Sequence, residues 1–490
     1  MSATMAKSAK AVPAARKTDT GEDHASSRGM LLTVLLVPLL ALAAYRLAAQ
    51  AATAPPAAAP SAAVRRHHLS PGVLADEEGA AWANATSFEE FFEAIVPWQP
   101  LRGAWMRAPL FFGKALPFVR GFVTLERDVM DLVEAGGSGF FVTDATRKDV
   151  RSWTAIVDKS KQRGSRPMLQ AALKNGVAAW NNAGALWPSL GRLSRLAQRF
   201  IGLPSNANVY VQGASGGEPV GFEQGIPLHN DKQDVFILQT EGRKRWRVYA
   251  PPHQSTVEGT WIYNRGKEGN VLRREHVPEL LVDVVLAPGE VLYIPAMFPH
   301  ETAIDETAID DAYAAGATGR TVATHVTLGF ETHTYGFDYW FLQNCFRIKF
   351  GGPSLSKLLN KHMAEVSDEE AADLHHTPGF GAIKGSKAER LDHLCKLLRI
   401  GERFGDKKML PDGIRCSEVT ELTDMVLAFF DGHLGRFLAA KDEIHDPEAV
   451  AATPAADRAA RNARIRKEKQ DSATKEMEGF CTDFNVVTFT

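Results

Sequence analysis

Two histidines and one aspartate constrain the fold of this chain more than any other residues. His229 and Asp231 are separated by one residue, so in an extended segment both side chains point to the same face and can hold one ion. His300 lies much later, at the end of a short apolar strand predicted for Val291 to Ile294. That strand can bring His300 to the other two residues only if the sheet curls back on itself, so the sequence favours a small β-barrel.

Two histidines and one carboxylate are also a recognisable ligand set. They hold a redox-active iron on one face and leave the opposite positions open, as in iron-dependent oxygenases. Each residue alone is weak evidence, because a His-x-Asp sequence arises by chance and His300 could be an ordinary polar residue at a strand end. This is the only His-x-Asp sequence among fifteen histidines. The joint pattern predicts an iron site, with His229, Asp231 and His300 as both metal ligands and catalytic residues.

A lysine on the following strand adds a second constraint. After the apolar run Val235 to Gln239 and a turn signal at Gly242, the segment Arg243 to Tyr249 is predicted as the returning strand. Alternation places Lys244 on the same face as Trp246 and Val248 and puts the arginines on the other face. A lone lysine is more often on the surface. Here an inward Lys244 would need an anion, because a buried ammonium without a partner is costly, and a dicarboxylate co-substrate could supply it.

A third histidine lies in the strand-like segment Thr324 to Phe330. Alternation places His325 with Ala323, Thr327 and Gly329. Two interpretations stay open for His325: a polar neighbour of the co-substrate, or a hydrogen-bonded structural histidine.

Three segments carry a family resemblance. The runs Pro227 to Gln239 and Gly242 to Pro251, followed by Gly289-Glu290, Pro295 and His300, resemble the JmjC-type cupin oxygenases, and within them the ribosomal-oxygenase (cupin-4) group. The resemblance is dense over about 205–332 and thin elsewhere. It implies an α+β fold built on a double-stranded β-helix, with Fe(II) held by His229, Asp231 and His300. It also implies dioxygen and 2-oxoglutarate as co-substrates, with Lys244 binding the distal carboxylate of 2-oxoglutarate.

The resemblance implies protein side-chain hydroxylation and favours a protein substrate over a small molecule. N-methyl-lysine demethylation and small-molecule hydroxylation are variants of the same chemistry, and a non-catalytic, membrane-tethered cupin binding module is the alternative from another class. The sequence departs from the family at Met297, where a glycine is common, and in an acidic, Ala/Gly-rich insertion at 305–320. The insertion lies near the expected mouth of the barrel, so the substrate preference of relatives cannot be carried over.

Composition excludes several other classes. The net charge of −2 gives no global basic surface, and we find no direct signal for nucleic-acid binding. The four cysteines, Cys345, Cys395, Cys416 and Cys481, are too widely spaced for a disulfide framework or a zinc site. There is no dinucleotide fingerprint, phosphate loop or nucleophile elbow.

The N-terminal part predicts a location. Residues 1–29 form a leader or cytosolic segment, and an uncharged apolar run within 30–49 is predicted to be a single-pass signal anchor, with the catalytic body lumenal. A secreted or organelle-targeted protein with a cleaved leader is the alternative. Residues 50–85 are predicted to be an Ala/Pro-rich tether without packed structure.

The remaining boundaries follow from changes in pattern. We predict an N-terminal wrapping region at 86–204, the catalytic barrel at 205–350, a helical C-terminal region at 351–450 and a charged tail at 451–490. Helices are expected, among others, at 166–180, 355–366, 387–400 and 419–440. The helical region could mediate homodimerisation, as such regions do in the resembled group, or it could cap the same monomer.

Overall fold

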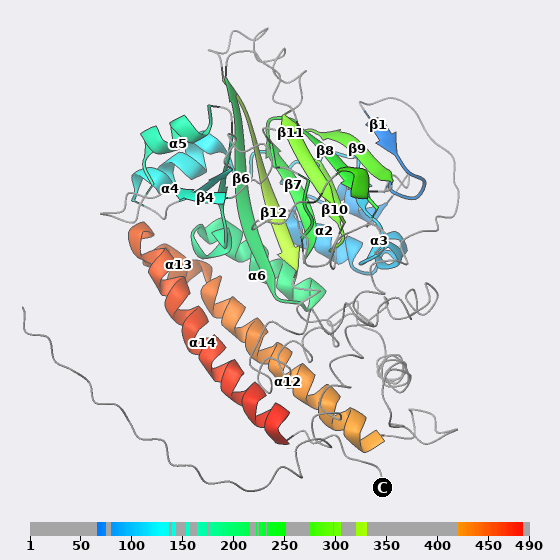
Figure 1. Ribbon diagram of the computed structural model, residues 1–490, viewed down its shortest axis with the longest axis vertical. Coiled ribbons are helices and arrows are strands. Elements are labelled where there is room, and N and C mark those ends of the chain that lie inside the picture. The colour runs from blue at the N-terminus through cyan, green and yellow to red at the C-terminus, as the bar shows by residue number, and fades with distance from the viewer. Residues whose placement is uncertain are drawn as a thin grey trace, which may run out of the picture.

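The protein is built on two antiparallel β-sheets (Figure 1). The computed structural model describes residues 66–136, 140–143, 153–156, 164–250, 272–304, 320–330 and 420–483, apart from short breaks within these ranges. The smaller sheet has the strand order β1 (Arg66–Leu69), β9 (Leu280–Leu286), β8 (Lys244–Tyr249), β11 (His300–Ile304). The larger has the order β2 (Leu110–Phe112), β10 (Val291–Ile294), β7 (Asp234–Glu241), β12 (Arg320–Phe330), β6 (Ser205–Ser215), β5 (Val177–Trp180), β3 (Phe140–Thr143), β4 (Trp153–Ile156).

The inner faces of the two sheets meet in an apolar core. Alternating residues of β7, β10, β8 and β9 pack into one buried cluster with Val73 and Phe111; its strand residues are Val235, Ile237, Trp246, Val248, Val282, Val284, Leu286, Leu292 and Ile294. The chain passes between the sheets at Gly242, whose φ is +63° and whose Cβ, if present, would lie 2.0 Å from the Val322 carbonyl oxygen. β8 therefore does not return along β7, as a simple hairpin would, but pairs with β9 and β11.

Helices cover the outer face of the larger sheet (Figure 1). They are α2 (Phe88–Ile95), α3 (Gln99–Ala104), α4 (Met130–Glu134), α5 (Arg166–Ala172) and α6 (Pro188–Ile201), with short turns at η1 (Ala81–Asn84), η2 (Leu125–Val129), η3 (Ala183–Ala185) and η5 (Arg274–His276). The Ser87 side chain accepts from the Glu90 backbone N–H and caps α2, and Gly202, at φ +74°, ends α6. The predicted α+β fold, a barrel wrapped by N-terminal helices and followed by a helical C-terminal region, is confirmed.

Two segment predictions differ from the structure. The helix expected at 166–180 ends at Ala172, and Val177–Trp180 instead forms β5, because its apolar residues pair with β6 and are buried on both faces. The predicted tether at 50–85 contains β1, which pairs with β9, and Val73, which is buried in the barrel core. The folded body therefore begins no later than Arg66.

The described C-terminal part forms three helices, α12 (Thr420–Ile444), α13 (Pro447–Ala452) and α14 (Ala455–Asp483). Figure 1 shows α12 and α14 side by side below the barrel. The Gln198 side-chain amide of α6 donates to the Leu438 carbonyl and to Asp442, so the end of α12 caps its own barrel. No contact among the described residues supports the predicted homodimer, which stays a prediction. The helices predicted at 355–366 and 387–400, and the insertion at 305–320, lie outside the described residues.

The predicted membrane localisation is contradicted. No helix in the described part of the chain is both long enough and apolar enough to cross a bilayer. α12 and α14 are long enough, but each carries charged residues along its length, such as Glu421, Asp431 and Lys441 in α12. The span predicted at 30–49 and the segments on either side of it, 1–29 and 50–65, lie outside the described residues.

Candidate metal centre

The two histidines of the predicted triad face each other across a backbone bridge. The N–H of His229 donates to the carbonyl of His300 at 3.0 Å, and the N–H of His300 donates back at 2.7 Å. Reciprocal bonding of this kind places two residues directly opposite each other with their side chains on the same face. The ring centroids lie 4.2 Å apart. This bridge places His229 beside β11, at the edge of the smaller sheet.

Asp231 completes the group. Its Oδ2 lies 3.6 Å from His300 Nε2 and 3.9 Å from His229 Nε2, as the one-residue spacing from His229 predicts. One donor atom from each of the three residues lies within 4.8 Å of the others. Both histidine side chains are buried, whereas that of Asp231 is 21% exposed, so the group opens to solvent on the aspartate side.

A backbone contact sets the tautomer of His300. Its Nδ1 lies 2.9 Å from the carbonyl oxygen of Phe298. A carbonyl oxygen can only accept, so Nδ1 carries the proton and Nε2 presents its lone pair toward Asp231 and His229. Contacts of this kind commonly orient a metal-binding histidine.

These residues fit a metal ion in size and in chemistry. Three ligands on one face of an ion, with bonds of about 2.1 Å at right angles, place their donor atoms about 3 Å apart. The observed separations of 3.6 and 3.9 Å require only a small contraction. Two imidazoles and one carboxylate suit Fe(II) and leave the remaining positions for other ligands.

Lys244 points into the barrel, as predicted, and its side chain is fully buried. The structure gives it no carboxylate partner among the described residues. Its Nζ instead lies 3.5 Å from Nδ1 of His325, at the long end of hydrogen bonding, and 5.6 Å from the centre of the Trp246 ring. Burial lowers the pKa of Lys244 to about 7. A buried ammonium without a counter-ion is costly, so its surroundings suit an anionic ligand.

His325 lies on β12, across the barrel interior from Lys244. Its ring is buried, stacks on Tyr210 at 5.0 Å between centroids, and meets the Trp246 ring edge-on at 5.1 Å. Its Nε2 has no hydrogen-bond partner in the described part of the chain. Burial, followed by the nearby charges of Lys244 and His300, holds the pKa of His325 well below its usual value, so the ring is neutral. The structure thus brings together both residues predicted to contact a co-substrate.

The outer face of the smaller sheet carries an ionic cluster that sequence reasoning missed. Arg245 donates to both carboxylate oxygens of Asp283, at 2.6 and 2.8 Å, and Arg247 donates to the same group at 2.9 Å. Burial would raise the pKa of Asp283, but the two arginines outweigh it and hold that pKa below its usual value. Both arginines are therefore half-buried and paired with Asp283. A single aspartate within the apolar strand Leu280–Leu286 was the signal in the sequence.

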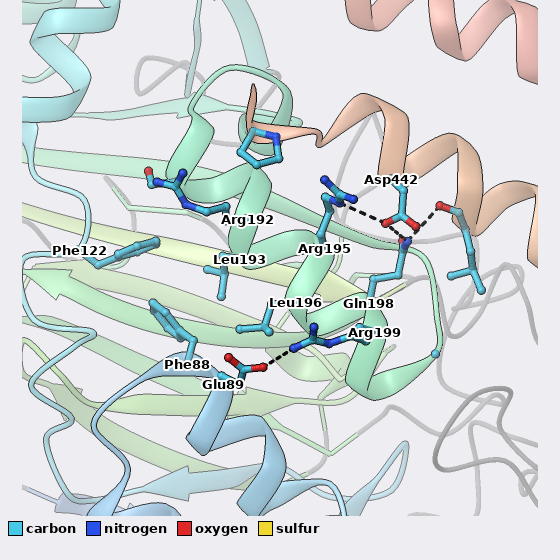
Figure 2. Close-up of a pocket in the computed structure, with 14 residues that line it drawn as sticks. Phe88, Glu89, Phe122, Arg192, Leu193, Arg195, Leu196, Gln198, Arg199 and Asp442 are labelled. Atoms are coloured by element: carbon cyan, nitrogen blue, oxygen red, sulfur yellow. Dashed lines mark hydrogen bonds and ion pairs between the residues drawn. The ribbon is translucent and has the colours of Figure 1, made fainter. Parts of the chain in front are cut away.

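A cavity of about 780 Å³ lies on the opposite side of the larger sheet (Figure 2). It runs along α6, with Phe88, Phe122, Leu193 and Leu196 among its apolar lining residues. Figure 2 shows its polar rim, where Arg199 pairs with Glu89, and Arg195 and Gln198 meet Asp442. None of the predicted site residues lines it, so the cavity has no part in the metal centre.

Comparison with known proteins decides the family of the central region. Residues 188–324 match the family model of the JmjC domain. The chain contains a JmjC domain. The match includes the three metal-binding candidates and Lys244, and it ends one residue before His325.

Relatives of the JmjC domain agree with this assignment. The chain is 37% identical over 120 residues to the bifunctional lysine-specific demethylase and histidyl-hydroxylase NO66 of Drosophila mojavensis, covering 24% of this chain and 12% of that protein. It is 27% identical over 231 residues to ribosomal oxygenase 2 of Rattus norvegicus, covering 44% of this chain and 45% of that protein. The chain thus spans less than half the length of these relatives. The resemblance to JmjC-type oxygenases of the ribosomal-oxygenase group is confirmed.

Solved structures add little to this assignment. The ribosomal oxygenase YcfD of Escherichia coli aligns with a TM-score of 0.33 and 18% identity, over 56% of this chain and 68% of that chain. A YcfD structure in complex with cobalt and 2-oxoglutarate aligns with a TM-score of 0.30 and 17% identity, over 68% of each chain. Similarity at this level carries no weight for this protein.

Proposed function

We propose that this protein is an Fe(II)- and 2-oxoglutarate-dependent dioxygenase that hydroxylates a side chain of a protein substrate. The observation that carries the proposal is the pairing of two features in one barrel. Two histidines and one carboxylate converge at the open side, and a buried lysine without a carboxylate partner lies in the interior. The first suits a redox metal and the second suits one end of a dicarboxylate.

Each residue has a defined role in this proposal. His229, Asp231 and His300 would hold Fe(II), which when bound supplies the chemistry that couples 2-oxoglutarate decarboxylation and dioxygen reduction to C–H hydroxylation. Lys244 would bind the distal carboxylate of 2-oxoglutarate by a charge-assisted hydrogen bond. Trp246 and Val248, buried beside Lys244 on the same strand face, would keep water from this bond and so strengthen it.

Substrate class is proposed from the relatives. Their names include histidyl-hydroxylase, ribosomal oxygenase and lysine-specific demethylase, and all of these act on proteins. Demethylation of N-methyl-lysine is the second candidate, because the same C–H oxidation on an N-methyl group yields an unstable product. The barrel at 205–350, the wrapping region at 86–204, the helical region at 351–450 and the tail at 451–490 remain proposed boundaries.

A binding module without catalysis is the competing function. It would need no lysine in the barrel interior, since burial of this cation destabilises the fold unless a ligand offsets it. An apolar residue at position 244 would serve such a module better. The retained Lys244 therefore favours an enzyme.

An anaerobic titration of the full chain tests the proposal. Fe(II) is added first and 2-oxoglutarate second, and the visible metal-to-ligand charge-transfer band of a chelated 2-oxo acid is recorded. We expect the band in the wild-type protein and its loss in His229→Ala. His433→Ala, which removes a buried histidine of α12 outside the barrel, is the matched control and should keep the band. Folded protein that binds iron without forming the band would contradict the proposed co-substrate.

A further inference from the structure

His445 lies where the C-terminal helices meet α6 and η3. It follows directly on α12, and the residue is 1% exposed. On the opposing surface are Gly184 of η3 and Gly191 of α6. A Cβ atom at Gly184 would lie 3.0 Å from Cδ2 of the imidazole, and one at Gly191 would lie 2.6 Å from the His445 carbonyl oxygen. The two glycines therefore allow His445 to pack closely against the body of the protein.

Neither ring nitrogen of His445 has a hydrogen-bond partner in the described part of the chain, and both are buried. The same holds for the hydroxyl of Ser194, on the same side of Gly184 as the imidazole. A neutral imidazole has one donor and one acceptor, whereas a protonated one has two donors and a full charge. An unpaired buried charge costs far more than an unpaired neutral group. This site therefore accommodates the neutral ring and opposes the protonated one.

The charged groups that act on His445 also oppose protonation. All three are cations, one from each of α12, α6 and α14: Lys441, Arg195 and Arg461. Burial, followed by these cations, holds the pKa of His445 well below its ordinary value of 6.5.

The acidic residues near His445 have other partners or are exposed. Asp442 and Asp446 lie 3.7 and 3.8 Å from the guanidinium of Arg195, and Asp442 also accepts from Gln198. η3 carries no titratable residue, and Glu448 of α13 is exposed. No described carboxylate is thus placed to balance a charge on the imidazole.

The apolar contact that accompanies His445 is small. Its buried cluster among the described residues consists of Ala185, Ile444 and Ile465. Local opening of such a contact costs much less free energy than global unfolding, so a single protonation can shift its population. α12 also contributes Leu438 and Asp442 to the cavity of Figure 2. Release of α12 would therefore remove one wall of that cavity.

We propose that His445 makes the docking of α12–α14 on α6 and η3 sensitive to pH: the neutral ring holds the helices in place, and protonation releases them. In the released state the imidazole is exposed and regains its ordinary pKa of 6.5. Above pH 6.5 both states are neutral and docking has its full strength. Below pH 6.5 the released state binds more protons, so docking weakens as pH falls. The docking equilibrium constant should be about tenfold lower at pH 5.5 than at pH 7.5.

Hydrogen exchange in the full chain tests this proposal. Exchange is measured at pH 7.5 and 5.5, and the intrinsic rate at each pH is divided by the measured rate to give a protection factor. The segment 438–452, which spans the end of α12 and α13, reports release, and β6 and β7 are the reference. In this segment the protection factor at pH 7.5 divided by that at pH 5.5 should be about tenfold larger in wild type than in His445→Gln, which does not titrate. His68→Gln, which removes an exposed histidine of β1, is the control and should match the wild type.

Comparison of wild type with His445→Gln separates His445 from the other groups that titrate. His433, a second buried histidine of α12, has a pKa that burial lowers to about 4, and it is present in both proteins. Burial raises the pKa of Asp442, so acidification acts on that carboxyl in the opposite direction, toward stronger docking. Both contributions cancel when the two ratios are divided.

Equal ratios in wild type and His445→Gln would overturn the proposal, as would a wild-type segment that keeps its full protection at pH 5.5. His445→Leu, which has no side-chain hydrogen-bonding atom, is measured as well and should behave as His445→Gln does. If neither variant protects the segment at pH 7.5, the wild type alone decides: protection must fall at pH 5.5 in 438–452 and stay unchanged in β6 and β7. A fall of equal size in these reference strands would mean that the whole fold, rather than the contact at His445, responds to pH.

Discussion

The cations on the two faces of β8 differ in whether the fold gives them acidic partners. On the outer face, Arg245 and Arg247 share the carboxylate of Asp283, and Arg247 also lies 3.8 Å from Glu301, so both cations have acidic partners within the fold. On the inner face, Lys244 is more deeply buried and meets only a neutral histidine and an aromatic ring in the described structure. The outer cations stabilise the strand, whereas the inner one weakens the fold until an anion binds. A charge that the fold leaves unbalanced is therefore the better guide to function.

The largest effect is expected from the loss of a metal ligand. Asp231→Ala removes one of three ligands, so iron affinity and turnover should fall by well over the roughly hundredfold seen when a residue that only supports a ligand is lost. Because the Asp231 side chain is partly exposed, thermal unfolding should change little. Fe(II) titration, succinate formation and a melting curve measure these quantities. A full-rate Asp231→Ala enzyme would falsify the assignment of the site.

Replacement of the inner cation should raise stability and destroy co-substrate binding together. Lys244→Met removes a buried ammonium whose folded-state pKa is about 7, against an ordinary value of 10.5. Below pH 7 the lysine is charged in both the folded and the unfolded state, so the full cost of burying the charge lowers the free energy of unfolding. This cost decreases as pH rises from about 7 to 10.5, because the folded state then holds a neutral lysine. We expect Lys244→Met to stabilise the protein by a few kcal/mol at pH 6, on the order of 2–5, and by less at pH 9. Chemical denaturation at both pH values measures this.

The same variant should bind 2-oxoglutarate at least about a hundredfold more weakly while still binding Fe(II). A Lys244→Met variant that is less stable than the wild type and still binds 2-oxoglutarate would show that the lysine is structural. The contrast between the two faces of β8 would then disappear.

Local alternation in the sequence was enough to predict part of this contrast. It placed Lys244 with Trp246 and Val248, and it placed His229 and Asp231 together, because side-chain direction in a strand depends only on neighbouring residues. The correct fold class came from the resemblance to the JmjC-type oxygenases, which implied an α+β fold built on a double-stranded β-helix.

The remainder depends on how distant strands are arranged. The partner of Arg245 is on β9, and the contact from Lys244 to His325 crosses from one sheet to the other, so neither follows from local spacing. The segment 177–180 was misread as helix because alanine favours helices, whereas here tertiary pairing with β6 overrides that preference.

The outer face should respond in the opposite direction to the inner one. Asp283→Ala leaves two half-buried arginines without their shared carboxylate, so it should destabilise the fold by roughly 2–4 kcal/mol. The affinity of the folded protein for 2-oxoglutarate should stay within a few-fold of the wild type. Denaturation and the charge-transfer titration measure the two effects. A variant that stays fully stable would mean that the arginines are satisfied by solvent and that the outer cluster does not anchor β8.

The smallest effect expected is the pH dependence of 2-oxoglutarate binding. Lys244 must be charged to hold a carboxylate, and its pKa in the ligand-free protein is about 7. Below pH 7 the lysine is already protonated and affinity should be constant. Above pH 7 binding must take up a proton, so the dissociation constant should rise about tenfold per pH unit. Lys244→Arg keeps its charge over this range, and its affinity, although altered by the different shape, should not follow this slope. If the dissociation constant changes with pH equally in the wild type and in Lys244→Arg, another group causes the pH dependence. Lys244 would then not titrate in this pH range.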